Sequence, residues 1–158
     1  MAHVSTATLK AVLDQHRVWL ETNGADGVSA ELAGACLRGP SLWHVDLRHA
    51  NLKGADLRGA SLDHARLAGA SASLQGACLA GTSLWRTDLS EADLAAADLR
   101  DAKLDYAILR AAILHGADLC GASFRETHLE GADLSEVVGL TSSQLEPALW
   151  NEETPPST

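Results

Sequence analysis

Leucine recurs at every fifth position along most of this chain, and that spacing dominates its hydrophobic pattern. The series runs from Leu32 to Leu67, is displaced by two residues, and resumes from Leu74 to Leu134. It comprises 21 five-residue repeats, whose central residue is Leu 20 times and Phe124 once. Alanine stands two residues before the centre in 16 of them. We therefore expect two inward and three outward positions in each repeat.

A period of five fits neither a helix nor a flat strand. On an α-helix, five residues advance by about 500°, which would scatter the leucines around the cylinder. On a strand, an odd step would send successive leucines to opposite faces. The pattern works only if the chain turns a corner within every repeat, so that four repeats close one square coil. The central side chains then form the core, among them Leu57, Leu79, Leu99, Leu119 and Phe124.

The repeats resemble a known family. The strings ADLRG at 55–59 and ADLCG at 117–121 are similar to the A-(D/N)-L-x-x signature of pentapeptide-repeat proteins. The resemblance covers residues 30–136. It implies an all-β fold, a right-handed quadrilateral β-helix, which would have about five coils in this chain.

Apolar residues recur at helical spacing between Thr6 and Thr22, before the repeats begin. They predict a helix within an N-terminal cap of residues 1–29. A cap is expected because the first coil of a solenoid exposes apolar side chains and an open backbone edge. We expect Trp19 to plug that coil.

The segment 137–158 is predicted to hold a short capping helix and a tail, with Thr141 as the helix N-cap. Leu145, Leu149 and Trp150 form its apolar side. The family that the repeats resemble includes gyrase-binding members, in which the C-terminal end makes a dimer. These three residues are therefore candidates for a homodimer contact, and a monomeric cap is the alternative.

Two extra residues, Ala70 and Ser71, interrupt the leucine series. A two-residue bulge at a corner would leave the four sides of the coil aligned. Alternatively, one side is truncated and every later repeat moves to the next side. The sequence leaves both open. With the bulge, every fourth repeat lies on the same side.

On that assumption, one side collects aromatic residues. Trp43, His64, Trp85 and Tyr106 follow their central residues at intervals of one coil. Trp, Tyr and Arg are enriched among the residues that dominate binding at protein interfaces. This side is therefore a candidate partner surface, although the rings could instead stack on one another and cover gaps in the ladder. His44 and His64 lack a third ligand, so no metal site is predicted.

The chain carries 12 Lys and Arg against 21 Asp and Glu, a formal net charge of −9. That argues against direct binding of nucleic acid through a basic surface. The acids are concentrated in residues 70–136. Asp88, Asp93, Asp98 and Asp118 are candidate contacts for a basic partner, and a self-compensating ladder of Asp and Arg is the alternative.

No residue pattern supports catalysis or a cofactor. The serines have no visible His and Asp partners, and neither a phosphate-binding loop nor a dinucleotide-binding glycine motif occurs. Cys36, Cys78 and Cys120 are an odd set without a secretory signal, so we expect reduced thiols and a cytoplasmic protein. No apolar run reaches the length of a membrane span. We expect no enzyme activity, no cofactor, no metal and no membrane contact.

The resemblance also implies a specific function. The best-characterised pentapeptide-repeat proteins bind bacterial type II topoisomerases, and some protect them from quinolones. By resemblance, this chain would be a DNA mimic that binds DNA gyrase or topoisomerase IV through acidic residues and protects it from inhibitors. It departs from those relatives in its moderate charge excess and its lack of long protruding loops. The alternative is a general protein-binding scaffold whose unrelated partner engages the aromatic side.

Overall fold

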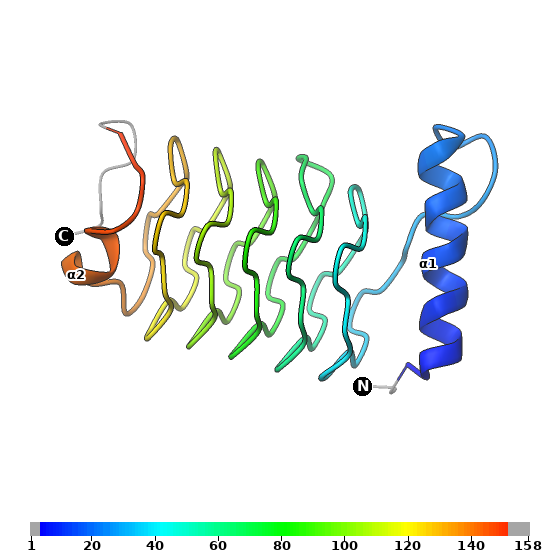
Figure 1. Ribbon diagram of the computed structural model, residues 1–158, viewed down its shortest axis with the longest axis horizontal. Helices are drawn as coiled ribbons and strands as arrows, with labels where there is room; N and C mark the ends of the chain where they lie inside the picture. The colour runs from blue at the N-terminus through cyan, green and yellow to red at the C-terminus, as the bar shows by residue number, and fades with distance from the viewer. Residues whose placement is uncertain (1–3, 152–158) are drawn as a thin grey trace.

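The computed structural model describes residues 4–151 of the chain as a column of stacked coils with a cap at each end (Figure 1). Helix α1 (Thr6–Glu21) lies across the N-terminal end of the column. Helix α2 (Ser142–Leu145) lies at the C-terminal end. Between them the chain forms no long strands, and neighbouring coils are joined by single-residue parallel β-bridges.

The bridges form four ladders, which define four sides of the column, numbered in chain order. Side 1 holds Glu31, Asn51, Ser73, Asp93, Ile113 and Asp133, and side 2 holds Cys36, Asp56, Cys78, Asp98, Asp118 and Val138. Side 3 holds Ser41, Ser61, Ser83, Lys103 and Ser123, and side 4 holds Asp46, Arg66, Asp88, Ile108, His128 and Leu149.

Backbone hydrogen bonds run along the column and join each coil to both neighbours. The Asp56 N–H donates to the Ala35 carbonyl at 2.9 Å, and the Asp56 carbonyl accepts from the Leu37 N–H at 2.8 Å. In the other direction, the Leu57 N–H donates to the Cys78 carbonyl at 2.8 Å. The backbone therefore satisfies its polar groups between coils, and only side chains enter the interior.

The interior is filled by the central residues and the alanines that precede them. Leu57, Leu79, Leu99 and Leu119 are 0% exposed and Phe124 is 1% exposed, as the five-residue register predicts. Three repeats carry threonine in place of the preceding alanine. Each of these buried hydroxyls donates to a carbonyl of the preceding coil, at 2.7–2.8 Å, from Thr82, Thr87 and Thr127.

The two-residue slip is a bulge that preserves the sides. Bridges between repeats that do not span it join residues 20 apart, as between Asp46 and Arg66. The last bridge, from His128 to Leu149 in the C-terminal segment, joins residues 21 apart. Bridges that span it join residues 22 apart, as between Asn51 and Ser73. Every ladder therefore continues on its own side through the bulge.

The N-terminal cap begins at Ser5, whose hydroxyl accepts from the Thr8 N–H. Leu9 and His16 are the buried residues of α1, and His16 is 0% exposed. The His16 Nδ1 accepts from the Ala30 N–H at 3.1 Å, where the first coil begins. Trp19 was the expected plug, but it is only partly buried and stacks on His16. The imidazole takes the central place because it can pair with the open backbone edge and indole cannot accept a hydrogen bond.

The C-terminal cap begins at Thr141, as predicted, and is much shorter than the N-terminal one. Thr141 and Gln144 form a reciprocal capping box. The Gln144 Nε2 also donates to the carbonyls of Leu119 and Ala122, at 3.0 and 2.9 Å. Leu145, at 6% exposed, covers the core. The predicted tail after Asn151 lies outside the described residues.

Candidate interaction surface

The predicted aromatic residues form a continuous ladder on side 3. The rings of His44 and His64 stack with centroids 4.7 Å apart. His64 meets Trp85 edge-on at 4.9 Å, and Trp85 meets Tyr106 edge-on at 6.2 Å. Trp43 extends the ladder past His44 and is 60% exposed. The bulge interpretation therefore brings together all four predicted residues of this side.

Side 3 differs from the other sides in its backbone as well. The second residue after each centre has a positive φ on all four sides, the left-handed region that costs a non-glycine residue about 1 kcal/mol. On sides 1, 2 and 4, ten of the 16 such positions are glycine, for example Gly54 and Gly81. On side 3 none of the five is glycine, and φ lies between 54° and 62° at His44, His64, Arg86, Tyr106 and Glu126.

Two arginines sit on the ladder. The Arg86 guanidinium lies 4.5 Å from the Trp85 ring centre and 5.7 Å from the Tyr106 ring centre. The Arg125 guanidinium lies 5.9 Å from the Tyr106 ring centre. Neither arginine was among the candidate site residues. The signal that could have found them is the absence of glycine after the centres of this side.

A groove of about 440 Å³ runs along the corner between sides 3 and 4. Four of the positive-φ side chains of side 3 form one wall, from His64 to Glu126. The opposite wall consists of Ile108, His128 and Leu149. The ladder therefore borders a depression with both apolar and charged lining.

The four acidic candidates are distributed over three sides. Asp93 lies on side 1, Asp98 and Asp118 on side 2, and Asp88 on side 4. All four occupy bridge positions and are partly buried. Each carboxylate accepts the backbone N–H two residues further on, at 3.0–3.2 Å. The aspartate of the repeat thus stabilises the turn, and its use as a partner contact stays a prediction.

Side 2 carries the self-compensating ladder of Asp and Arg that was the alternative hypothesis to acidic partner contacts. Asp56 is 2% exposed and pairs with Arg38 at 2.6 Å and with Arg58 at 2.7 Å. Asp98 pairs with Arg100 at 2.8 Å. The hydrogen bonds from Arg100 lower the pKa of the Asp98 carboxyl to about 2. These carboxylates are neutralised within the protein.

The cysteines and histidines form no reactive group in the part of the chain that the structure describes. Cys36 and Cys78 lie two bridges apart on side 2, and all three thiols are free. Burial raises the pKa of the Cys78 thiol. Within residues 4–151 no three His, Cys, Asp or Glu side chains are placed to hold a metal ion.

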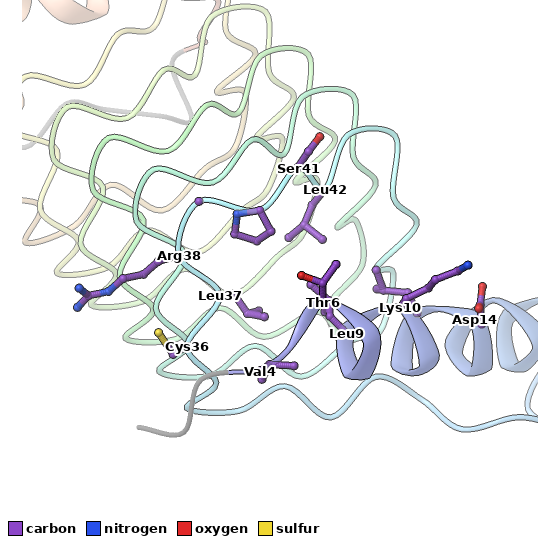
Figure 2. Close-up of a pocket in the computed structure, with 13 residues that line it drawn as sticks. Val4, Thr6, Leu9, Lys10, Asp14, Cys36, Leu37, Arg38, Ser41 and Leu42 are labelled. Atoms are coloured by element: carbon purple, nitrogen blue, oxygen red, sulfur yellow. The ribbon is translucent and has the colours of Figure 1, made fainter.

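A second depression, of about 700 Å³, separates α1 from the first coil (Figure 2). Leu9 and Leu13 line the helix side, and Leu37 and Leu42 line the coil side. Both coil leucines are under 5% exposed, so the helix already covers them. The Val4 N–H donates to the Cys36 carbonyl, which ties the start of the cap to the coil edge.

A four-sided column with a repetitive core and outward ladders defines a class, the repeat solenoids. The model for pentapeptide repeats matches this chain in eight copies, over residues 41–73, 70–105 and 103–138. The matches cover more than half of the sequence, so this chain belongs to the pentapeptide-repeat family. No curated protein matches it.

Solved pentapeptide-repeat structures are similar to this chain. Rfr23 from the cyanobacterium Cyanothece 51142 is 25% identical, with a TM-score of 0.58 over 92% of this chain and 99% of its own. A protein from Nostoc PCC 7120, alr5209, is 30% identical over 93% and 96%, with a TM-score of 0.46. A trypsin-treated form of QnrB1, a plasmid-mediated fluoroquinolone resistance protein, is 21% identical over 80% and 64%, with a TM-score of 0.59. The last likeness shows the fold alone.

Over the described residues, neither helix has the length and apolar character that crossing a bilayer requires.

Proposed function

We propose that this protein is a non-catalytic interaction module whose protein partner docks on side 3. The observation that carries the proposal is the row of five positive-φ positions that all keep a side chain. A coil that needed only turns there would be served by glycine, because glycine avoids the steric cost. Retaining His, Arg, Tyr and Glu at that cost is the pattern of a surface under selection for contact.

Residue type also supports this proposal. Trp and Arg are common energetic centres of protein interfaces. On side 3, Arg86 lies over the Trp85 ring, and Trp43 is linked to Trp85 through His64. Backbone hydrogen bonds between coils hold the residues of the ladder in place. Its rings are therefore preorganised before a partner binds.

Retention of a partner from extracts of the source cells tests the proposal. Immobilised wild-type protein should retain a discrete partner, and Trp85→Ala should lose it. The matched control is Ile113→Ala, because Ile113 is 43% exposed on side 1 and should be dispensable. Equal retention by both variants would refute the assignment of the partner to side 3.

A second candidate is the DNA mimic that binds DNA gyrase or topoisomerase IV and protects it from inhibitors. The net charge of −9 and the rod shape favour it, as does the fold shared with QnrB1. The contacts would be Asp88, Asp93, Asp98 and Asp118, presented on three sides to a basic groove.

A gyrase supercoiling assay, with and without a quinolone, tests this candidate. Asparagine is the right substitution for the four acids, because it keeps the turn acceptor and removes the charge. If the candidate holds, wild-type protein inhibits gyrase or reverses quinolone-induced cleavage at micromolar concentration, and the asparagine variant does neither. No effect of folded wild-type protein would eliminate it.

In the second candidate, we propose that two copies join through their C-terminal ends and lengthen the rod. Leu149 and Trp150 are 39% and 48% exposed there, whereas Leu145 is already used inside the cap. Sedimentation of wild type against Trp150→Ala tests this: a shift from dimer to monomer supports it. We further propose a cytoplasmic location, which suits three free thiols.

A further inference from the structure

Side 3 gathers most of the solenoid cations that have no carboxylate partner. Seven of the 12 Lys and Arg residues form ion pairs, on α1 and on sides 2 and 4. Across residues 4–151, the five without such a pair are Lys10 on α1, Lys53 on side 1, and Arg86, Lys103 and Arg125 on side 3. Among the described residues, sides 1 and 3 are therefore the two sides without a Lys or Arg ion pair, and side 3 is the aromatic one.

The acids of side 3 do not offset these cations by contact. Asp63 accepts from the Ser83 hydroxyl at 2.5 Å and from the Trp85 N–H at 3.0 Å. Asp105 accepts from the Arg125 N–H at 3.0 Å. Both carboxylates thus bond to the next coil along the ladder. Glu126 remains as the exposed acid of this side, at the C-terminal end of the groove.

The groove sets an apolar wall opposite a wall that carries Arg86 and Glu126. Ile108 and Leu149 face it from side 4, and Tyr106 and Arg86 face it from side 3. It crosses several coils along the column axis, so its shape suits an extended chain. The spacing of two coils is about 9.6 Å, and one turn of a polyproline II helix is about 9.3 Å. An extended chain with an acid at every third residue would keep in step with alternate coils.

We propose that side 3 and its groove bind an extended acidic segment of the protein partner. The partner's carboxylates meet Arg86, Lys103 and Arg125, and its apolar side chains meet Ile108 and Leu149. This proposal rests on the proposed function, that side 3 is the partner surface, and adds the partner's chemistry.

A protein segment fits better than single-stranded nucleic acid. Nucleic-acid platforms offer free ring faces to the bases. Here the Trp85 and Tyr106 rings pack edge-on, and the Arg86 guanidinium covers both. The apolar wall at Ile108 and Leu149 suits side chains rather than phosphates. A net charge of −9 also opposes a polyphosphate more strongly than a short acidic peptide.

The test measures binding of a fluorescent peptide built from repeated Glu-Pro-Leu units by anisotropy. We expect saturable binding that weakens as salt rises. Matched peptides with Gln or Lys in place of Glu should bind at least tenfold more weakly. Arg86→Gln and Arg125→Gln should each weaken binding by roughly threefold to tenfold, since charge-assisted bonds at an exposed site contribute moderately. Lys53→Gln on side 1 should change nothing.

Glu126→Gln gives a test of sign, because removing the acid that lines the groove should strengthen binding of the Glu peptide. Equal affinity for the Glu and Gln peptides, or no binding of either, would overturn the proposal. Tighter binding of a thymidine oligonucleotide of equal length would reassign the surface to nucleic acid. The proposed function fails separately, if Trp85→Ala retains the cellular partner.

Discussion

At the scale of single residues, the repeat signature separates into structural and free positions. Where an Asp or Asn precedes the centre, it closes its own turn, as Asp93 does by accepting the Ala95 N–H. From the sequence alone these residues were interpreted as an acidic surface. Neither the net charge nor the repeat spacing shows which carboxylates accept a backbone hydrogen bond in their own turn. In contrast, the aromatic ladder was predictable, since Trp43, Trp85 and Tyr106 recur in coil register.

Replacing Arg86 with glycine should separate binding from stability. The substitution relieves a positive φ of 54° and removes the guanidinium from the ladder. We expect partner retention to fall while the melting temperature stays within a few degrees of wild type, because relief of strain offsets the lost packing.

The matched control reverses the change in the same coil. Gly81 has a φ of 65° and open space around it, so Gly81→Arg places a side chain on side 2 at the same backbone cost. We expect a loss of about 1 kcal/mol with no effect on binding. A large loss of stability in Arg86→Gly would show that the arginine serves the fold.

Asp98→Asn should remove part of the acid sensitivity of the protein. The folded-state pKa of Asp98 is lowered to about 2, so its pairing stabilises the fold above the ordinary pKa of 3.8. That contribution is lost as the pH falls through about 2. Denaturant titrations between neutral pH and pH 2 should show the variant less stable at neutral pH, by about 1 kcal/mol or less after solvent screening. The difference should shrink as the pH approaches 2, and a constant difference would contradict the assignment.

At the scale of elements, the five-residue period determines the coil and the caps complete it. Leu and Ala fill the interior, so the register was readable from the sequence. The sequence could not show whether the two extra residues form a bulge or truncate one side, because both arrangements have the same local sequence around Ala70. The identity of the N-terminal plug also depended on the fold, since only the open edge at Ala30 favours His16 over Trp19.

Leu99→Lys and Arg100→Ala test the register directly. Leu99 is fully buried, and a lysine there would place an unpaired charge in the core, so the variant should not fold. Arg100 is 55% exposed, and its removal should leave the melting temperature close to that of wild type. Similar melting temperatures for the two variants would contradict the account of the coil.

The N-terminal cap should weaken in mild acid through His16. Burial lowers the pKa of His16 below its ordinary value of 6.5, with Asp46, Arg48 and His49 nearby. The unfolded state then binds the proton first, so stability is lost as the pH falls below about 6.5. Thermal melts between pH 7.5 and about 5 should show this fall in wild type. His16→Leu should be less stable at neutral pH and lack the fall, and an equal slope would assign it to other groups.

At the scale of the whole molecule, the column carries different chemistry on different sides. Side 2 neutralises its acids internally, while side 3 keeps rings and unpaired cations turned outward. The net charge of −9 conceals this arrangement, because it averages over all sides. A partner that binds one side therefore contacts a surface whose charge differs from the average. For this reason the composition favoured acidic contacts, whereas the geometry favours the aromatic ladder.

The most direct test of the central claim compares the four sides in one experiment. A photoreactive residue is placed in turn at Lys53, Arg38, Ser61 and Arg66, one on each side, and cross-linked in the source cells. If partners dock on side 3, the position of Ser61 should give the dominant cross-linked protein, and Trp85→Ala in the same chain should abolish it. A dominant product from any other side, unaffected by Trp85→Ala, would contradict the account.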